Sequence, residues 1–413
     1  MEMRRRVVIT GLGLVTPLAM GCEESWLALC QGKSGIDKIT RFDASSFEVQ
    51  IAAEVKDFHP EDFLDKKRIR RTDLFTQYAL AATQMAIDDS RLAINGSNSY
   101  RTGVILGTCV GGLVTFAKNI AALLEGGVES ISPFLTPMFI PNMGASEISI
   151  AFGARGPSRC ISTACATGGH GIGDALRLIQ HGEADAMIAG GSEAGIVPII
   201  IGSLTRLKAL STRNDEPERA SRPFDKDRDG FVNGEGAGVM ILEELEMARH
   251  RGARIYAELV GSGSNVDGYH ATKPDYDSQA RCMKLALDDA GISPDQVDYI
   301  NAHGTSTQLN DACETVAIKI ALGQHSQKVL ISSNKSMIGH SWGAAGAVEG
   351  IFTVLAIRDN IVPPTINYEN PDTECDLDYV PNVARKAEVE YAISNSFGFG
   401  GMNSVLALKK FHE

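Results

Sequence analysis

The sequence has no excess of basic residues, no cysteine pair of the Cys-x-x-Cys type and no apolar stretch long enough to span a membrane. Its 413 residues carry 39 Lys and Arg against 51 Asp and Glu, a formal net charge of −12, which argues against a nucleic-acid binder. The eight cysteines lack metal-binding spacing with histidines, so they indicate neither a zinc site nor a disulfide framework. A reduced, cytoplasmic setting fits this cysteine usage.

No segment has the pattern of a membrane span or of a cleaved signal. The uncharged run 102–117 is shorter than the about 20 residues that a membrane helix needs. Three arginines before an apolar run near the N-terminus imitate a signal peptide, but Gly11, Gly13 and Pro17 interrupt that run. We interpret Arg6–Thr10 as a buried strand that enters a glycine turn.

What the sequence does contain is a repeat of strands and helices in one order. RRVVITGLGLV and RIYAELVGSGSNV match, as do the helices ATQMAIDDSRL and RCMKLALDDAGI. The next pairs are RTGVILGT with VDYINAHGT, CISTACATGGHGIGDALRLI with VLISSNKSMIGHSWGAAGAVEGIFTVL, and ADAMIAGGSEAG with YAISNSFGFGGMNS. Five pairs predict an α/β protein of two similar halves, 1–255 and 256–413. The first half adds a long Gly- and Pro-rich loop over 125–144.

One cysteine, Cys165, lies among small residues in the stretch ISTACATGGHGIGDA. The predicted strand 158–163 and the predicted helix 165–180 form a sharp elbow, which exposes a nucleophile and turns its own N–H toward an oxyanion. The positive end of the helix favours thiolate over thiol, and the small neighbours leave room for a bulky acyl group. The elbow alone is equally compatible with a packed structural cysteine.

Two histidines of the second half are candidate partners for this cysteine. His303 follows the predicted strand 297–302, where active sites of α/β proteins gather. His340 lies in the turn that corresponds to the elbow of Cys165. Each histidine alone is as compatible with a structural role, but the three residues at pseudo-symmetric strand ends predict one site.

The motifs STACATG, NAHGTSTQLND, NKSMIGH and NSFGFGGMN resemble those of the elongating, type II β-ketoacyl-ACP synthases of the thiolase superfamily, and the likeness covers essentially the whole chain. The resemblance implies a thiolase-like fold with mixed sheets packed in αβαβα layers. It implies an acyltransferase that condenses a cysteine-bound acyl chain with malonyl-ACP, with loss of CO₂, in fatty-acid elongation. The implied partners are acyl carrier protein (ACP) and a second copy in a homodimer, with neither nucleic acid nor membrane. No cofactor or catalytic metal is implied, although a structural monovalent cation is compatible with the resemblance.

The resemblance also implies roles for individual residues. Cys165 carries the acyl group, and the N–H groups of Cys165 and Phe399 form the oxyanion hole. Neutral His303 and His340 bind the enolate oxygen, and Lys335 keeps them neutral. The other implied positions are the gate glycines Gly398, Gly400 and Gly401, the substrate-binding residues Val110, Thr272, Thr305 and Thr307, and the carrier-docking residues Lys67, Arg70, Arg71 and Lys208. We expect Val110 and Phe399 at the mouth of an acyl tunnel, which is lined by residues of the 133–141 loop of this chain or of a partner subunit.

The combination of residues separates the candidate functions. Thiolases use a second cysteine near the C-terminus, which NSFGFGGMN lacks, and type III synthases place Asn where His340 stands. A ketosynthase of a specialised lipid or polyketide pathway shares the chemistry, whereas a non-catalytic chain-length factor lacks the nucleophile. Gln308, Trp342 and Met402 replace the family's usual residues, and the last two are expected near the pocket that selects chain length.

Two charged stretches have alternative interpretations. KKRIRR, residues 66–71, is either a solvated helix face or a dock for an acidic carrier protein. DKDRDG, residues 225–230, begins like a calcium loop but lacks the later ligands, so we predict a structural turn.

Overall fold

The computed structural model describes residues 4–413, and its centre is a ten-stranded mixed sheet with the order β10-β9-β13-β14-β8-β1-β7-β6-β4-β5. Two five-stranded halves meet where β1 and β8 pair in antiparallel sense. The first half contains β1 (Val7–Val15), β4 (Thr102–Gly107), β5 (Ser158–Ile161), β6 (Ala186–Glu193) and β7 (Gly236–Glu244). The second contains β8 (Ala257–Val266), β9 (Tyr299–Asn301), β10 (Leu330–Ser332), β13 (Tyr391–Gly398) and β14 (Met402–Lys410).

The two halves have the same topology. From edge to centre, β5-β4-β6-β7-β1 corresponds to β10-β9-β13-β14-β8. In each half the two outer pairings are parallel and the two inner pairings are antiparallel. This confirms the predicted α/β fold of two similar halves. The boundary at residues 255 and 256 falls in the loop before β8 and stays a prediction, because the halves share one sheet.

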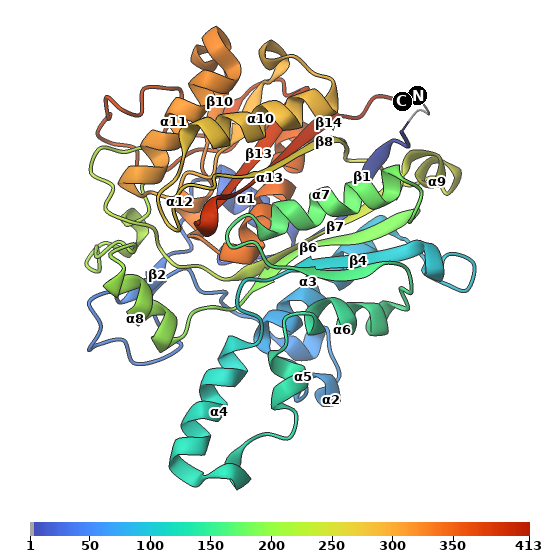
Figure 1. Ribbon diagram of the computed structural model, residues 1–413, viewed down its shortest axis with the longest axis vertical. Coiled ribbons are helices and arrows are strands. Elements are labelled where there is room, and N and C mark those ends of the chain that lie inside the picture. The colour runs from blue at the N-terminus through green and yellow to red at the C-terminus, as the bar shows by residue number, and fades with distance from the viewer. Residues whose placement is uncertain (1–3) are drawn as a thin grey trace.

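Helices form three layers around the two half-sheets (Figure 1). α7 and α13 pack against each other between the halves, α3 and α6 cover the outer side of the first half, and α10 and α11 cover that of the second. Their bounds are α3 Leu74–Ser90, α6 Met143–Phe152, α7 Thr167–Gln180, α10 Tyr276–Ala290, α11 Gln308–Leu322 and α13 Ala345–Asp359. α13 lies fully inside this arrangement, because each of its residues from Ala345 to Ile357 is buried. The order αβαβα agrees with the predicted layers.

The first strand differs from its prediction. β1 runs without a turn to Val15, so Gly11 and Gly13 lie inside the strand. A Cβ on Gly13 would lie 1.9 Å from the carbonyl oxygen of Ala82 in α3. These glycines therefore allow α3 to pack closely against β1, and they do not form a turn.

The predicted loop 125–144 is also partly wrong, because it contains helical turns. α4 (Leu113–Gly126) ends inside it, and η3 (Val128–Ser130) and α5 (Leu135–Phe139) follow. Pro137 falls in the first turn of α5, where its missing N–H costs no helix hydrogen bond. Together α4 and α5 form an arm that projects from the body (Figure 1).

Shorter elements connect the layers. The remaining helices are α1 (Cys22–Cys30), α2 (Lys66–Ile69), α8 (Pro198–Arg206), α9 (Leu245–His250) and α12 (Lys335–Ile338). The remaining strands are β2 (Asp37–Lys38), β3 (Ile51–Ala52), β11 (Ile361–Val362) and β12 (Arg385–Lys386). The other single turns are η1 (Pro60–Asp62), η2 (Ser99–Arg101), η4 (Pro217–Arg219), η5 (Pro294–Gln296), η6 (Gly323–Gln327), η7 (Trp342–Ala344) and η8 (Phe399–Gly401). Within residues 4–413, no helix combines the length and the apolar character needed to cross a membrane.

The contact of β1 with α3 predicts a large effect of one methyl group. Gly13→Ala should lower the free energy of unfolding by about 3 kcal/mol, because backbone atoms of Ala82 and Ala86 in α3 block the new Cβ. The matched control is Gly96→Ala, whose Cβ would meet nothing within 4 Å, and we expect a change below about 0.5 kcal/mol. Urea unfolding measures both; equal stability of the two variants would contradict the close contact.

Candidate active site

Cys165 lies in a tight turn between β5 and α7. The helix begins at Thr167, two residues after the cysteine, rather than at the cysteine as the sequence predicts. Ala164 has φ 51°, a conformation that bends the chain sharply before the thiol. An added Cβ on Gly398 would lie 2.9 Å from the N atom of Cys165, so the end of β13 approaches the turn as only glycine allows.

The structure brings the three predicted reacting residues together. His303 follows the end of β9, and His340 lies between α12 and α13. The Cys165 sulfur and one nitrogen of each imidazole lie within 4.8 Å of one another. The two rings meet edge to face, with centroids 5.3 Å apart.

Burial keeps both imidazoles neutral. It lowers the pKa of His303 and that of His340 well below 6.5, and the nearby Lys335 ammonium lowers both pKa values further. His340 Nδ1 accepts the N–H of Trp342 at 3.2 Å. The proton of the neutral His340 ring is therefore on Nε2, which makes this nitrogen a hydrogen-bond donor.

Two buried carboxylates hold this arrangement. Lys335 Nζ, itself buried, forms an ion pair with Glu349. Burial raises the pKa of Glu349 to about 7, although the lysine acts in the opposite direction. Glu314 accepts the backbone N–H of His303 and that of Gly304, each at 2.8 Å.

The thiol does not behave as the helix dipole alone predicts. Burial raises the pKa of Cys165 to about 11, so the free site holds a thiol rather than a thiolate at neutral pH. The N–H groups of Phe399 and Cys165 act in the opposite direction, as does Lys335. Both predicted oxyanion donors thus lie beside the sulfur.

A cavity of about 610 Å³ opens onto the thiol and contains most of the predicted substrate contacts. The predicted residues along its wall are Val110, Lys208, Thr272, Thr305, Thr307, Gly398, Phe399 and Gly401. Trp342 and Gln308 also line it. Met402 and Gly400 lie outside the described lining, so of the three departures from the family only two face this cavity.

The comparisons with known proteins agree with this geometry. Two family models match the chain, Beta-ketoacyl synthase, N-terminal domain, over residues 4–248 and Beta-ketoacyl synthase, C-terminal domain, over residues 256–369. This chain belongs to the β-ketoacyl synthase family. The ketosynthase is therefore an enzyme of the acyltransferase class.

Individual relatives cover its full length. A 3-oxoacyl-[acyl-carrier-protein] synthase 2 of Coxiella burnetii is 55% identical over 99% of this chain and 100% of its own. The ishigamide ketosynthase/chain length factor structure has a TM-score of 0.94 at 38% identity, over 99% of this chain and 100% of its own. A type II polyketide ketosynthase, solved in complex with its acyl-carrier protein, has a TM-score of 0.92 at 38% identity with the same shares.

Phe399, the predicted gate residue, lies in a glycine-rich turn at the cavity wall. Phe399 begins η8 and is 40% exposed at the cavity wall. Gly400 and Gly401 follow with φ 79° and 71°, values that favour glycine. The N–H of Gly400 donates to the carbonyl oxygen of Ala271 at 2.7 Å, which joins this turn of the ketosynthase to the loop of Thr272.

The basic run 66–71 lies on the surface, away from the cavity lining. Lys67, Arg70 and Arg71 are exposed on and after the short helix α2. The Arg71 guanidinium stacks over the Phe134 ring of the projecting arm, 4.6 Å from its centroid. Lys208 lies at the cavity itself, with φ 57°.

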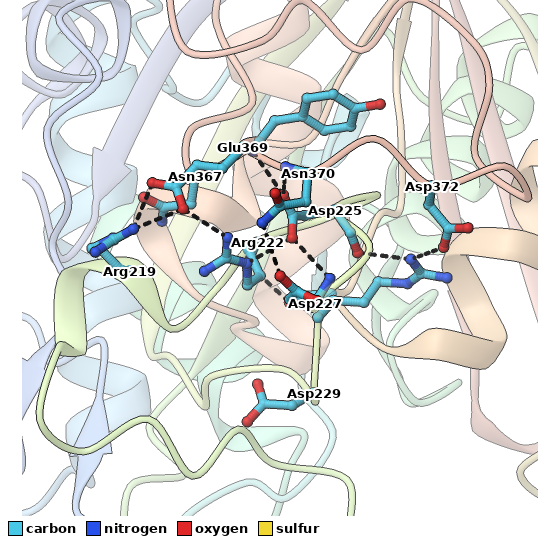
Figure 2. Close-up of polar contacts among 12 residues, drawn as sticks. Arg219, Arg222, Asp225, Asp227, Asp229, Asn367, Glu369, Asn370 and Asp372 are labelled. Atoms are coloured by element: carbon cyan, nitrogen blue, oxygen red, sulfur yellow. Dashed lines mark hydrogen bonds and ion pairs between the residues drawn. The ribbon is translucent and has the colours of Figure 1, made fainter.

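DKDRDG is a structural turn, as predicted (Figure 2). The Asp225 carboxylate accepts a 3.0 Å bond from Arg222 and the N–H groups of Glu369 and Asn370, both at 2.7 Å. Both oxygens of the Asp225 carboxylate therefore already accept hydrogen bonds from the protein. The turn leads to Phe231, whose ring lies 5.3 Å from that of His340.

Six buried side-chain oxygens have no hydrogen-bond partner among residues 4–413, and four of them belong to β9, α13 and β13. These four are Asn301 Oδ1, Glu349 Oε2, Ser394 Oγ and Asn395 Oδ1. Ser394 is the register partner of Asn301 across β13 and β9, and Asn395 Nδ2 donates to Glu314 at 3.1 Å. Oxygen ligands with one anionic member fit a hard cation.

The sequence analysis missed the carboxylates Glu193, Glu314 and Glu349. Each is buried and bonds to the backbone or side chain of a segment that carries a site residue. Their signal was an acidic residue inside an apolar or small-residue stretch, such as GGSEAG for Glu193. A buried carboxylate of this kind requires several donors.

Proposed function

We propose that the ketosynthase elongates fatty acyl chains by condensing a Cys165-bound acyl group with malonyl-ACP. One observation carries this proposal: a thiol and two neutral imidazoles lie within 4.8 Å of one another. The full-length identity to 3-oxoacyl-ACP synthases supports it. The presence of all three groups argues against a non-catalytic chain-length factor.

In the first step, Cys165 exchanges with the thioester of acyl-ACP. Its sulfur forms a bond to the acyl carbon, the bond from that carbon to the carrier sulfur breaks, and the thiol proton passes to the leaving carrier thiolate. The exchange conserves protons, so a thiol with a pKa of about 11 ends as a neutral acyl-enzyme. The N–H groups of Cys165 and Phe399 stabilise the intermediate oxyanion.

In the second step, malonyl-ACP loses CO₂ and its thioester becomes an enolate. The electron pair of the broken carbon–carbon bond moves toward the thioester oxygen, which His303 and His340 stabilise as neutral donors. The α-carbon then attacks the acyl-cysteine, and the Cys165 thiolate leaves and takes a proton from solvent. The product is a β-ketoacyl-ACP. Lys335 supports this step by opposing protonation of either histidine.

The carrier docks on positive charge at the surface of an acidic protein. Lys208 at the cavity and the exposed Lys67, Arg70 and Arg71 are the docking residues we propose. The arm of pantetheine enters past Thr305 and Thr307, whose hydroxyls lie 2.9 Å apart on the wall. The complex of a related ketosynthase with its carrier protein supports this partner. A cytoplasmic location agrees with eight free cysteines.

A second copy of the chain completes the protein as a homodimer. β5 is the outermost strand of the sheet, and the projecting arm exposes apolar side chains: Ile120, Leu123, Leu124, Val128, Phe134 and Ile140. Such a surface favours burial against a partner. The described cavity lining has no residue of the 133–141 loop, so we propose that the partner's copy of this loop borders the acyl tunnel.

A specialised polyketide or lipid pathway is the second candidate. The fold of this chain matches those of the ishigamide ketosynthase/chain length factor and of the type II polyketide ketosynthase, with TM-scores of 0.94 and 0.92, but the sequence identity to each is only 38%. The 3-oxoacyl-ACP synthase reaches 55%, which favours fatty-acid elongation.

We also propose a structural monovalent cation at three of the donor-less oxygens behind the site. Asn301, Glu349 and Ser394 would hold it, since Asn301 and Ser394 are register partners on one face of the sheet and the Asn301 amide bonds to α13, the helix of Glu349; its charge would favour the ionised form of Glu349. It would strengthen the ion pair that keeps Lys335 beside the histidines.

The division of labour predicts separable half-reactions. Cys165→Ala should abolish both acyl-enzyme formation and condensation. His303→Ala and His340→Ala should still acylate, because the oxyanion donors remain, but should lose about 10²–10³-fold in malonyl-ACP decarboxylation. Intact-protein mass spectrometry with a panel of acyl-ACPs measures acylation and chain preference, and CO₂ release measures decarboxylation. Condensation by Cys165→Ala, or a histidine variant blocked only at acylation, would overturn these roles.

Charge reversal tests the docking residues. The triple variant Lys67→Glu, Arg70→Glu and Arg71→Glu should raise KM for acyl-ACP about tenfold at low salt, an effect that screening reduces as salt rises. An acyl-N-acetylcysteamine thioester, which lacks the carrier, should react as with the unaltered enzyme. The control reverses the exposed residues Arg281, Lys284 and Lys328. Equal losses in both triple variants would leave KKRIRR as a solvated face.

The cation proposal predicts an ion-specific stability. At about a hundredfold excess over its dissociation constant, Na⁺ or K⁺ should add about 2.7 kcal/mol relative to choline at equal ionic strength. Ser394→Ala should weaken this response, whereas Ser404→Ala, which alters a buried serine on the neighbouring strand β14, should not. Thermal unfolding measures the effect, and the same Tm in all three salts would contradict the site.

A further inference from the structure

Glu193 is the last residue of β6, and its carboxylate is fully buried beside the active site. Oε1 accepts the hydroxyl of Thr108 at 2.8 Å and the N–H of Val110 at 3.2 Å. Oε2 accepts the N–H of Cys109 at 2.7 Å and that of Gly343 at 3.0 Å. Four donors therefore converge on one side chain to which the reaction gives no role.

These donors belong to two segments that face the reaction from different sides. The segment 108–110 follows β4 and ends in Val110, on the cavity wall. Gly343 belongs to η7, the turn after His340, in which the N–H of Trp342 donates to His340 Nδ1. The segments touch, since a Cβ on Gly343 would lie 2.7 Å from Glu193 Oε2 and 2.8 Å from the N atom of Cys109.

We propose that Glu193 is a positioning residue that holds the acyl-pocket wall at Val110 and the turn of His340 in fixed relation to Cys165. This rests on the proposed function, in which the wall receives the acyl chain and His340 stabilises the enolate. One carboxylate then serves both half-reactions, although it touches neither substrate.

Only an ionised carboxylate satisfies this set of donors. Each of its oxygens accepts two hydrogen bonds, whereas a glutamine amide has one acceptor atom and two N–H groups. In Glu193→Gln the amide nitrogen must therefore face two donors, either those of Thr108 and Val110 or those of Cys109 and Gly343. The first arrangement leaves the segment 108–110 with the bond from Cys109 alone, and the second removes the only bond of Gly343 to this side chain.

The charge of Glu193 has a second, measurable effect. It raises the pKa of Cys165, in opposition to Lys335, which lowers it. Two variants separate the effect of the charge from that of side-chain length. Glu193→Gln removes the charge and keeps the length of the side chain. Glu193→Asp keeps the charge and shortens the side chain by one methylene.

The test compares these two variants with Glu243→Gln. Glu243 is an equally buried carboxylate on the adjacent strand β7, bonded to Thr10 and Arg251 away from the cavity. Each protein is assayed for malonyl-ACP decarboxylation, for acylation of Cys165, and for iodoacetamide alkylation of Cys165 from pH 7 to 11. Rates are normalised to the folded fraction from circular dichroism.

We expect Glu193→Gln and Glu193→Asp to lower kcat for decarboxylation about 10- to 100-fold, as small misplacements of reacting groups do. KM for malonyl-ACP should change less than about twofold, because docking lies elsewhere. Only Glu193→Gln should move the alkylation profile to lower pH. Glu243→Gln should keep the unaltered kcat and profile.

Several results would overturn the proposal. If the normalised kcat of both Glu193 variants equals that of Glu243→Gln, the role of Glu193 is merely structural. If the pH profile of alkylation is unchanged in Glu193→Gln, the charge of Glu193 does not act on the Cys165 thiol. If Glu193→Gln does not fold, Thr108→Val, which removes one donor, must lower kcat several-fold for the proposal to stand. Alkylation needs no acyl substrate, so failure of the unaltered enzyme to condense would refute the proposed function separately.

Discussion

The backbone contact between α7 and α13 determines where the reacting groups lie. A Cβ on Gly168 would fall 2.6 Å from the N atom of Ala347, and one on Gly346 would fall 2.7 Å from that of Gly169. Only glycine permits helices to approach this closely. Because Cys165 precedes α7 and His340 precedes α13, this contact of the two helix beginnings brings the thiol to the imidazole. A larger residue at either glycine would push the two helices apart and move the Cys165 thiol away from the His340 imidazole.

Burial at this contact then decides the charge of each group. The same loss of water raises the pKa of Cys165 to about 11 and lowers that of both histidines. One ammonium, Lys335, opposes the first shift and adds to the second. It thus acts in the useful direction on all three groups, because it favours thiolate and disfavours imidazolium. That ammonium is itself buried and forms an ion pair with Glu349, because a buried charge requires an opposite charge beside it.

The sequence predicted what depends on pattern and order. The repeat of five segments was enough to predict the two α/β halves, and the resemblance located Cys165, His303 and His340, which lie together in the structure.

The prediction that failed at β1 shows the limit of local sequence. A glycine for a turn and a glycine for a close helix contact have the same local sequence, and only the position of α3 distinguishes them. The effect expected of the backbone N–H groups on the Cys165 thiol is present but is outweighed by burial, since a helix terminus is local but desolvation depends on residues from both halves. Glu193 was missed because its four donors come from two segments distant in sequence.

The unequal length of the two equivalent connections explains how similar halves come to do different chemistry. In the first half, β5 leads through a short turn to α7, and Cys165 occupies that turn. In the second half, the corresponding connection from β10 to α13 contains the extra helix α12, Lys335–Ile338. This insertion provides the buried lysine as well as His340, and it lengthens the path so that Gly343 reaches Glu193 in the first half. The longer connection therefore supplies both the Lys335 ammonium, which lowers the pKa of Cys165, and the Gly343 N–H, which bonds to Glu193 of the first half.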